Sequence, residues 1–164
     1  MAREFLASLD ASGRRFGVVA SRYSRMVTDR LVAGFLECLR QHGVSEDAVE
    51  IVWVPGSFEI PLAALAAARS GRFDAVVGLG CVIRGETPHF EHIAREASRG
   101  LFQVGYETGV PTVFGVITAD TSEQAIERAG LKGGGRGYDS AMVALEMIGV
   151  LAHLRTQGRP AKRR

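Results

Sequence analysis

Four short apolar runs, each followed by a turn and then by a stretch with helical periodicity, constrain the fold of this chain more than any other feature. The runs occupy residues 16–20, 51–54, 75–77 and 112–117 and are rich in β-branched side chains. Continuous apolar runs of this length are typical of buried parallel strands. Strands that alternate with helices predict an open parallel sheet with right-handed crossovers and with helices on both faces. We therefore expect a three-layer α/β sandwich around a four-stranded parallel sheet.

The stretches between the apolar runs define the expected helices. An amphipathic helix ends at His42-Gly43, a helix from Pro88 continues to about Tyr106, and the last helix covers residues 141–154. We interpret the run at 51–54 as a second central strand. His42 and His153 lie near helix ends, where the simplest prediction is a solvated side chain.

Residues that directly follow the strands are the first candidates for a binding site. In open parallel sheets, ligands bind beyond the carboxyl ends of the strands. Tyr23 follows the first strand, residues 57–59 follow the second, and residues 81–89 follow the third. We expect these residues to meet at one edge of the sheet. Local sequence does not decide whether Phe114, Arg128 and Arg136 reach the same pocket or that of a neighbouring subunit.

The turn after the third strand combines two chemical functions. Thr87 followed by Pro88 is a typical helix opening, because the hydroxyl can cap free N–H groups and proline in the first turn loses no hydrogen bond. Gly85 allows a tight turn just before. The positive end of a helix dipole binds anions, and His89 in the first turn adds a titratable imidazole. The sequence therefore predicts an anion-binding turn and a proton carrier in one pocket.

Two other interpretations of this stretch are weaker. Gly78-x-Gly80 could begin a dinucleotide fingerprint, but Ile83 stands at the third glycine position and no acidic residue closes a second strand at the usual distance. His89 and His92 could bind a metal ion with Glu59 or Glu86, but no further His or Cys lies at zinc-like spacing. The sequence therefore favours neither a dinucleotide site nor a metal site in this stretch.

The turn after the second strand contains further candidate residues for helix capping and for ligand binding. Ser57 can cap the following helix, and Pro61 can stand in its first turn. Glu59 at a helix start either opposes the dipole or accepts hydrogen bonds from a polyol in the pocket.

After the fourth strand, the sequence leaves open the roles of Arg128 and of the loop 132–137. Thr121 and Gln124 form a capping box for a short helix over residues 122–129. Arg128 lies in its last turn, where the dipole favours a cation whether or not the residue also binds a ligand. The basic, glycine-rich loop 132–137 either closes over an anionic substrate or simply joins two helices.

The expected domain boundaries follow composition and charge. Residues 1–14 form an N-terminal arm that either adds a short strand to a neighbouring subunit or frays, residues 15–156 form one flavodoxin-like α/β domain, and residues 157–164 form a basic, disordered tail. The chain has a formal charge of +2, and removing the four basic residues of the last six changes it to −2. A general nucleic-acid surface is therefore not expected.

Cysteine usage and hydropathy indicate the compartment. Cys38 and Cys81 lack a pairing pattern, which fits a reducing environment. The sequence contains no run of eighteen uninterrupted apolar residues and no apolar signal core after Arg3 and Glu4. We expect a cytoplasmic protein that does not insert into membranes.

Three long segments together resemble the signature blocks of one enzyme family, the 6,7-dimethyl-8-ribityllumazine synthases. The segments are Val-Pro-Gly-Ser-Phe-Glu-Ile-Pro at 54–61, Gly-Cys-Val-Ile-Arg-Gly-Glu-Thr-Pro-His-Phe at 80–90 and Glu-Gln-Ala-Ile-Glu-Arg-Ala-Gly at 123–130. They occur in the order of the family, and the resemblance extends over about residues 12–155.

This resemblance implies a function in riboflavin biosynthesis. Members condense 5-amino-6-ribitylaminouracil with 3,4-dihydroxy-2-butanone 4-phosphate and release phosphate and water, without a metal or organic cofactor. The family also implies a homopentamer with pockets between subunits, and an association with riboflavin synthase. The loop 132–137 is short, as in members that assemble twelve pentamers into a hollow 60-subunit capsid. The alternatives are a non-catalytic flavin- or lumazine-binding protein and a shell-forming protein on the same fold.

The resemblance also implies a role for each candidate residue. His89 would be the proton carrier, and the phosphate-binding residues would be Gly85, Glu86, Thr87 and Arg128. The residues expected to hold the pyrimidine and its ribityl chain are Tyr23, Ser57, Phe58, Glu59, Cys81, Val82, Ile83, Phe114 and Arg136. In the family, Phe114 and Arg128 come from the neighbouring chain. Two positions depart from the family: Arg136 replaces a common lysine, and Glu86 places a negative charge beside the phosphate turn.

Overall fold

A four-stranded parallel sheet forms the centre of the molecule in the computed structural model, which describes residues 1–130 and 134–157. The strands are β1 (Phe16–Ser21), β2 (Val49–Val54), β3 (Ala75–Ile83) and β4 (Thr112–Ala119). Their order across the sheet is β2-β1-β3-β4, and every neighbouring pair is parallel. The predicted α/β class and the parallel sheet are thus confirmed.

The predicted position of one strand within the sheet was wrong. β2 is an edge strand that pairs only with β1 in the described chain, whereas the sequence interpretation placed it in the centre. Its side chains are mostly half-buried, and Val52 is exposed. An apolar run alone does not separate an edge strand from a central one, because strand order depends on how distant segments pair.

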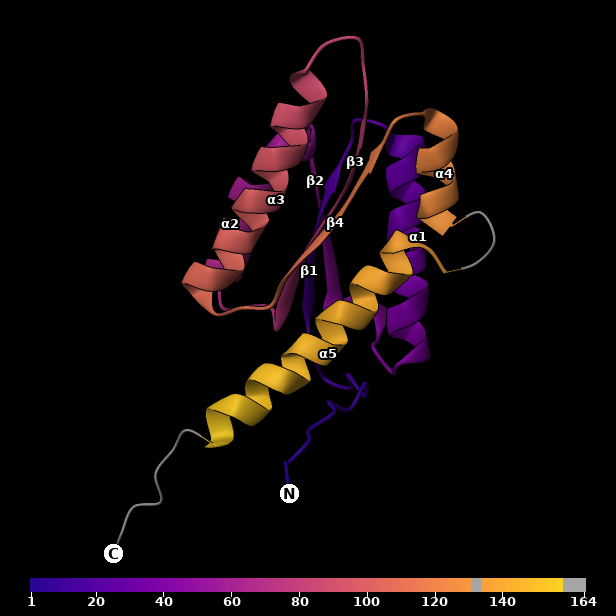
Figure 1. Cartoon of the computed structure of the whole chain (residues 1–164). Helices are drawn as coiled ribbons and strands as arrows, with labels where there is room; N and C mark the ends of the chain where they lie inside the picture. Colours follow the sequence, from indigo (N-terminus) through magenta and orange to yellow (C-terminus); the bar gives the residue numbers. More distant parts are fainter. Residues whose placement is uncertain (131–133, 158–164) are drawn as a thin grey trace, which may run out of the picture.

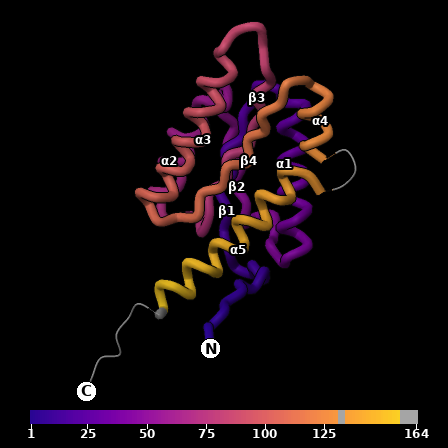
Figure 2. The backbone as a smooth tube through the Cα atoms, viewed as in Figure 1, coloured from indigo at the N-terminus to yellow at the C-terminus, as the bar shows by residue number. Residues whose placement is uncertain are grey.

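Helices cover both faces of the sheet. The α-helices are α1 (Arg25–Gln41), α2 (Ile60–Arg69), α3 (His89–Thr108), α4 (Ser122–Gly130) and α5 (Arg136–Gln157), and short 3-10 turns cover Glu46–Ala48 and Ser57–Glu59. Figure 1 shows α2 and α3 on one face of the sheet and α1, α4 and α5 on the other. The tube in Figure 2 shows the same three layers, with the β3–α3 turn and α4 at one end of the molecule and the N-terminus at the other. The predicted three-layer sandwich is therefore confirmed.

Two hydrophobic cores hold these layers together, one on each face of the sheet. Val18 points into the core under α1 and α5, and the next residue, Val19, points into the core under α2 and α3. Successive side chains of a strand point to opposite faces, so a strand that is covered twice must be apolar at every position. All six residues of β1 are buried, which explains its continuous apolar run.

The last helix begins earlier than the sequence indicated. α5 starts at Arg136, five residues before the predicted start at Ala141, so Arg136 and Gly137 belong to a helix rather than to a loop. A Cβ atom at Gly137 would collide with the backbone of Leu31 in α1. The two helices therefore cross at backbone contact, and only glycine fits there. Residues 132 and 133 of the predicted loop lie outside the described residues.

The N-terminal arm lies against α5. Within the described chain, residues 1–15 form no helix or strand, and the ring of Phe5 stacks on that of His153 at a centroid distance of 3.8 Å. His153 is thus half-buried, which corrects the prediction of a solvated side chain. His42 is half-buried too, with Nδ1 2.8 Å from the Cys38 carbonyl oxygen. The predicted C-terminal tail at 158–164 lies outside the described residues.

A helix that spans a membrane must be both long and strongly apolar. No helix in residues 1–130 and 134–157 is both long and apolar enough to cross a bilayer.

Candidate functional site

A large cleft opens at the carboxyl ends of β1, β2 and β3. Its volume is about 920 Å³. Its lining residues come from the turns after these strands and from the start of α3: Tyr23, Pro55, Gly56, Ser57, Phe58, Glu59, Cys81, Val82, Ile83, Gly85, Thr87, His89, Phe90, His92 and Ile93. The three segments that the strand-end rule grouped therefore meet in one concave site.

The inner wall of the cleft carries an unpaired hydroxyl group. Ser57 is 5% exposed, and its Oγ has no hydrogen-bond partner in the described chain. A Cβ atom at Gly80 would lie 2.7 Å from Ser57 Oγ and 3.0 Å from Ser21 Oγ, so only glycine fits beneath these hydroxyls. A buried hydroxyl without a partner is costly unless water or a ligand satisfies it.

The predicted capping role of Ser57 was wrong. α2 begins at Ile60 with Glu59 at the N-cap position, and Ser57 lies in the preceding 3-10 turn. Pro61 stands in the first turn of α2, as predicted. The exposed Glu59 carboxylate bends back towards Gly56, since a Cβ there would lie 3.1 Å from Glu59 Oε2. Both residues therefore line the cleft, and neither side chain forms a capping hydrogen bond with α2.

Two aromatic side chains border the opening of the cleft. Tyr23 is 76% exposed and Phe58 is 55% exposed. Exposed apolar side chains that lie together at a concave site are typical of a ligand-binding surface. They provide flat surfaces on which a planar ring can stack.

The turn between β3 and α3 is open to solvent. Residues 84–89 are all exposed, and α3 begins at His89 with Pro88 as its N-cap. The predicted cap by Thr87 was wrong: no side chain of the described residues caps this helix end. The N–H groups of His89 and Phe90 have no partner in the described chain and can bind an anion at the positive end of the helix dipole, whereas that of Glu91 donates to the Pro88 carbonyl oxygen at 3.0 Å.

Two imidazoles lie at the start of α3. His89 and His92 are both exposed and both line the cleft. Glu86 is exposed as well but is not among the lining residues of the described chain. Within residues 1–130 and 134–157, no group of three His, Cys, Asp or Glu side chains is arranged to hold a metal ion.

Cys81 lies near the end of β3, where Val82 and Ile83 continue the wall of the cleft. Burial raises the pKa of the Cys81 thiol to about 11. Because the thiolate is the nucleophilic form, this cysteine stays protonated and unreactive near neutral pH. The site therefore carries no activated cysteine at this position.

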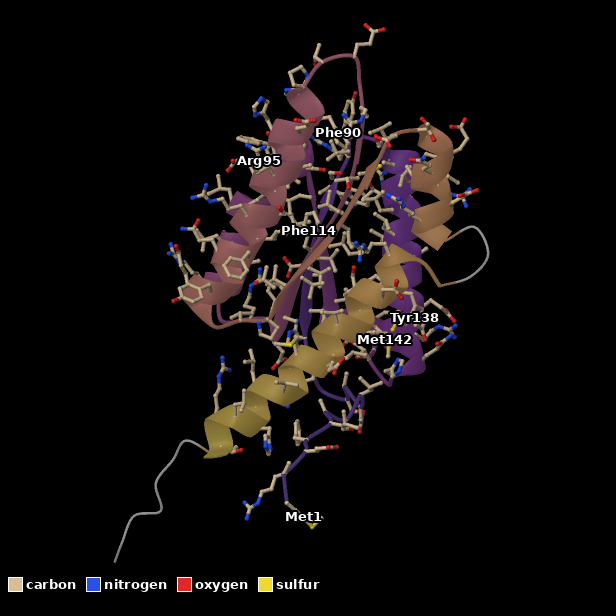
Figure 3. All side chains as sticks on the ribbon, viewed as in Figure 1. Met1, Phe90, Arg95, Phe114, Tyr138 and Met142 are labelled. Carbon is tan, nitrogen blue, oxygen red and sulfur yellow. The ribbon has the colours of Figure 1, made fainter. Side chains whose placement is uncertain are left out.

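The remaining candidates meet in a second hollow. Phe114, Arg128 and Arg136 line a concavity of about 400 Å³ between β4, α4 and α5. In the described chain, this hollow and the cleft share no lining residue. Figure 3 labels Phe114 on β4 and Phe90 at the start of α3, separated along the molecule. Within one protomer, Phe114, Arg128 and Arg136 therefore do not reach the cleft.

Arg128 is held at the edge of the second hollow. Its Nη1 donates to the Thr118 carbonyl oxygen at 2.6 Å, and the rest of the exposed guanidinium remains available. The predicted capping box of α4 is half formed: the Gln124 N–H donates to Thr121 Oγ1 at 3.2 Å, but Gln124 Oε1 accepts from the Asp120 N–H at 2.9 Å.

Sequence reasoning did not single out Phe90, His92 and Ile93 as cleft residues. They lie at the start of α3, which borders the cleft. For His92 and Ile93 the sequence contained a signal, because they follow His89 by three and four residues and therefore share its helix surface.

Comparison with protein families gives a match over most of the chain. The family model described as 6,7-dimethyl-8-ribityllumazine synthase matches residues 13–152. The matched region contains every candidate site residue discussed above, from Tyr23 to Arg136.

Proposed function

Since the chain belongs to the 6,7-dimethyl-8-ribityllumazine synthase family, a transferase family of riboflavin biosynthesis, we propose that it condenses 5-amino-6-ribitylaminouracil with 3,4-dihydroxy-2-butanone 4-phosphate. The reaction releases phosphate and water. One observation carries the proposal: a single cleft contains exposed aromatic side chains, an unpaired buried hydroxyl and a helix start with an imidazole.

The pyrimidine substrate fits the inner part of this cleft. Tyr23 and Phe58 offer exposed aromatic surfaces for its ring. Ser57 Oγ and the Glu59 carboxylate can bind the hydroxyl groups of the ribityl chain, because a polyol both donates and accepts hydrogen bonds. The backbone at Cys81, Val82 and Ile83 faces the same cleft and can bind the polar edge of the ring.

The phosphate substrate fits the open start of α3. The free N–H groups around Gly85 and Thr87 carry partial positive charge and suit a phosphate group. A guanidinium binds two phosphate oxygens at once, so Arg128 of a neighbouring subunit would complete the site. Glu86 adds a negative charge on the outer side of this turn and lowers phosphate affinity only if it turns inwards.

The chemistry needs proton transfer and a leaving group but no covalent enzyme intermediate. The aromatic amine attacks the ketone and loses water to give an imine. A base then removes the proton from the neighbouring carbon while phosphate leaves, and the resulting enol becomes a second ketone. The ribitylamino nitrogen attacks that ketone, and loss of water closes the ring. His89 is the proposed base and proton carrier, and this role is worth about 10²–10⁴ in rate.

Orientation supplies most of the remaining acceleration. Holding two reactants in attacking geometry converts a bimolecular step into an effectively unimolecular one. The cleft offers one wall for the pyrimidine and an adjacent helix start for the phosphate, which supports this mode of catalysis.

The separation of the two hollows supports a ring-shaped homo-oligomer. Phe114, Arg128 and Arg136 would face the cleft of the next subunit, and a closed cyclic arrangement gives every cleft such a neighbour. We propose a pentamer, and a 60-subunit shell of twelve pentamers as its higher assembly. Light scattering and sedimentation give the mass of the assembly and test this part separately.

The direct test of the activity is to mix the purified protein with both substrates. The expected result is the fluorescence of the lumazine product together with one equivalent of released phosphate. Neither signal should develop when either substrate is omitted. A protein that binds the pyrimidine or a flavin but releases no phosphate would be a binding protein, and the proposed activity would then be wrong.

A further inference from the structure

Arg84 contacts three separate segments beside the anion-binding turn. It directly follows β3, and its N–H donates to the Ala119 carbonyl oxygen at 2.9 Å. Its Nε donates to Asp120 Oδ1 at 2.7 Å, in the connection between β4 and α4. Its Nη1 lies 3.7 Å from Glu91 Oε1, and its guanidinium lies 4.9 Å from the centroid of the Phe90 ring, both in the first turn of α3. Figure 3 shows Phe90 at this start of α3.

The turn that these contacts enclose has few others. In the described chain, no side-chain hydrogen bond involves residues 85–88, and all four residues are exposed. Arg84 stands at one end of the turn and touches Phe90 and Glu91 just beyond the other end. The Arg84 side chain therefore connects the residues before the turn with those after it.

The partner of Arg84 is itself held in place. The Asp120 N–H donates to Gln124 Oε1 at 2.9 Å, and Gln124 belongs to α4. The same helix carries Arg128, whose Nη1 donates to the Thr118 carbonyl oxygen. The turn beside the cleft and the helix beside the second hollow are thus connected through the Arg84–Asp120 pair.

The contacts of Arg84 stabilise the conformation of this turn rather than the fold as a whole. The side chains of Arg84, Asp120 and Glu91 are 52%, 62% and 56% exposed. Ion pairs this exposed contribute little to the free energy of folding. They can still select one conformation of an exposed turn, because a guanidinium that bonds a carboxylate and stacks on a ring has a defined orientation.

We propose that Arg84 is a positioning residue for the anion-binding turn 85–88. It holds the turn and His89 against the β4–α4 connection, so that the N–H groups of the turn keep the orientation that phosphate needs. The inference rests on the proposed function, since it concerns the site for the phosphate substrate. No substrate contact by Arg84 itself is required.

The first test uses Arg84→Met, which keeps the length of the side chain and removes its charge and hydrogen bonds. The Michaelis constant for the butanone phosphate should rise about tenfold, because small misplacements of a binding group are costly. The constant for the pyrimidine should stay within about twofold. Arg84→Lys keeps the charge without the planar fork, so it should restore only part of the affinity.

The chain offers a matched control in Arg72. Its Nη1 bonds Glu50 Oε2 at 2.5 Å, and its guanidinium lies 4.7 Å from the Phe73 ring centroid, which reproduces the contacts of Arg84 away from the cleft. Arg72→Met should leave both Michaelis constants unchanged. If Arg72→Met and Arg84→Met have the same effect on the phosphate substrate, Arg84 has no special role.

A second variant separates positioning from charge. Asp120→Asn removes one carboxylate near the anion site, which would strengthen phosphate binding if charge alone mattered. Positioning predicts weaker binding, and the double variant with Arg84→Met should be no worse than Arg84→Met alone. A lower Michaelis constant for the phosphate substrate in Asp120→Asn overturns the proposal.

Hydrogen exchange provides a readout besides activity. In Arg84→Met the hydrogen-bonded amides at the two ends of the turn, those of residue 84 and Glu91, should exchange faster, while the exchange of β3 and the melting temperature stay unchanged. Equal exchange of these amides overturns the positioning role. The wild-type assay distinguishes the two proposals: wild-type protein without product contradicts the proposed function, whereas an active wild type and an equally active Arg84→Met contradict only the role of Arg84.

Discussion

His89 is the first residue of α3 and lines the cleft together with His92. If His89 carries the proton, His89→Ala should lower the turnover number by about 10²–10⁴ with small changes in both Michaelis constants. His92→Ala is the matched control, because this imidazole lies in the same cleft one helical turn further on. Single-turnover rates at saturating substrate measure both. Full turnover in His89→Ala, or a larger loss in His92→Ala, would assign the proton transfer elsewhere.

Gly85 gives a second test of the anion-binding turn. It lies outside the left-handed backbone region, and a Cβ atom there would meet no atom within 4 Å in the described chain. Gly85→Ala should therefore leave the melting temperature unchanged. The methyl group would nevertheless intrude on a bound phosphate, so the Michaelis constant for the phosphate substrate should rise several-fold. An unchanged constant would place the phosphate away from this residue.

The thiol of Cys81 should be chemically silent. With its pKa raised to about 11 by burial, it is protonated at pH 8 and should react with iodoacetamide about 100-fold more slowly than a free cysteine. The raised pKa also makes the free energy of unfolding depend on pH. Between pH 9 and 11 the unfolded chain loses this proton while the folded chain keeps it, so the free energy of unfolding should fall as pH rises through this window.

Mass spectrometry of Cys38→Ala after timed alkylation measures the reaction of Cys81 alone. The same protein in urea should react at the ordinary rate. Fast alkylation of the native protein at pH 8 would contradict the burial of the thiol.

The helices α1 and α5 cross at backbone contact. A Cβ atom at Gly137 would collide with the Leu31 carbonyl group, and this group cannot move without bending α1. Gly137→Ala should lower the free energy of unfolding by about 3 kcal/mol, despite the better helix propensity of alanine. Urea unfolding measures the change, and Gly85→Ala serves as the control for adding a methyl group in open space. Equal stability of the two variants would show that the helices can separate.

The side chains that cap the helices were predicted correctly for some helices and wrongly for others. The Thr121–Gln124 pair predicted the start of α4, and the Gln124 N–H bond to Thr121 is present. Ser57 and Thr87 suggested caps in the same way, but neither forms one among the described residues. A serine or threonine before a helix can also turn to a cleft or to solvent, and local sequence does not decide between these directions.

The two hollows of one protomer lead to a prediction for the assembly. If the cleft of one subunit faces Arg128 of the next, mixed rings of His89→Ala and Arg128→Ala chains contain some sites with both residues intact. With random mixing, about a quarter of the sites should regain activity. Co-expression of differently tagged chains and purification through both tags measures this.

Each variant alone, prepared in the same way, is the control for complementation. A mixed preparation that stays as inactive as the single variants would mean that His89 and Arg128 act within one chain or not together. Sedimentation of the mixed preparation would confirm that both chains occupy one assembly.

The sequence by itself determined the order of strands and helices, the grouping of Tyr23, Ser57–Glu59 and His89 at one sheet edge, and the family. Apolar periodicity, turn residues and the strand-end rule are local or general, so they can be applied along a single chain. Only the tertiary structure decided that β2 lies at the edge, that Ser57 faces the cleft unpaired, and that Arg128 belongs to a separate hollow. Strand order and side-chain direction depend on contacts between residues far apart in the sequence, and these contacts exist only once the layers have packed.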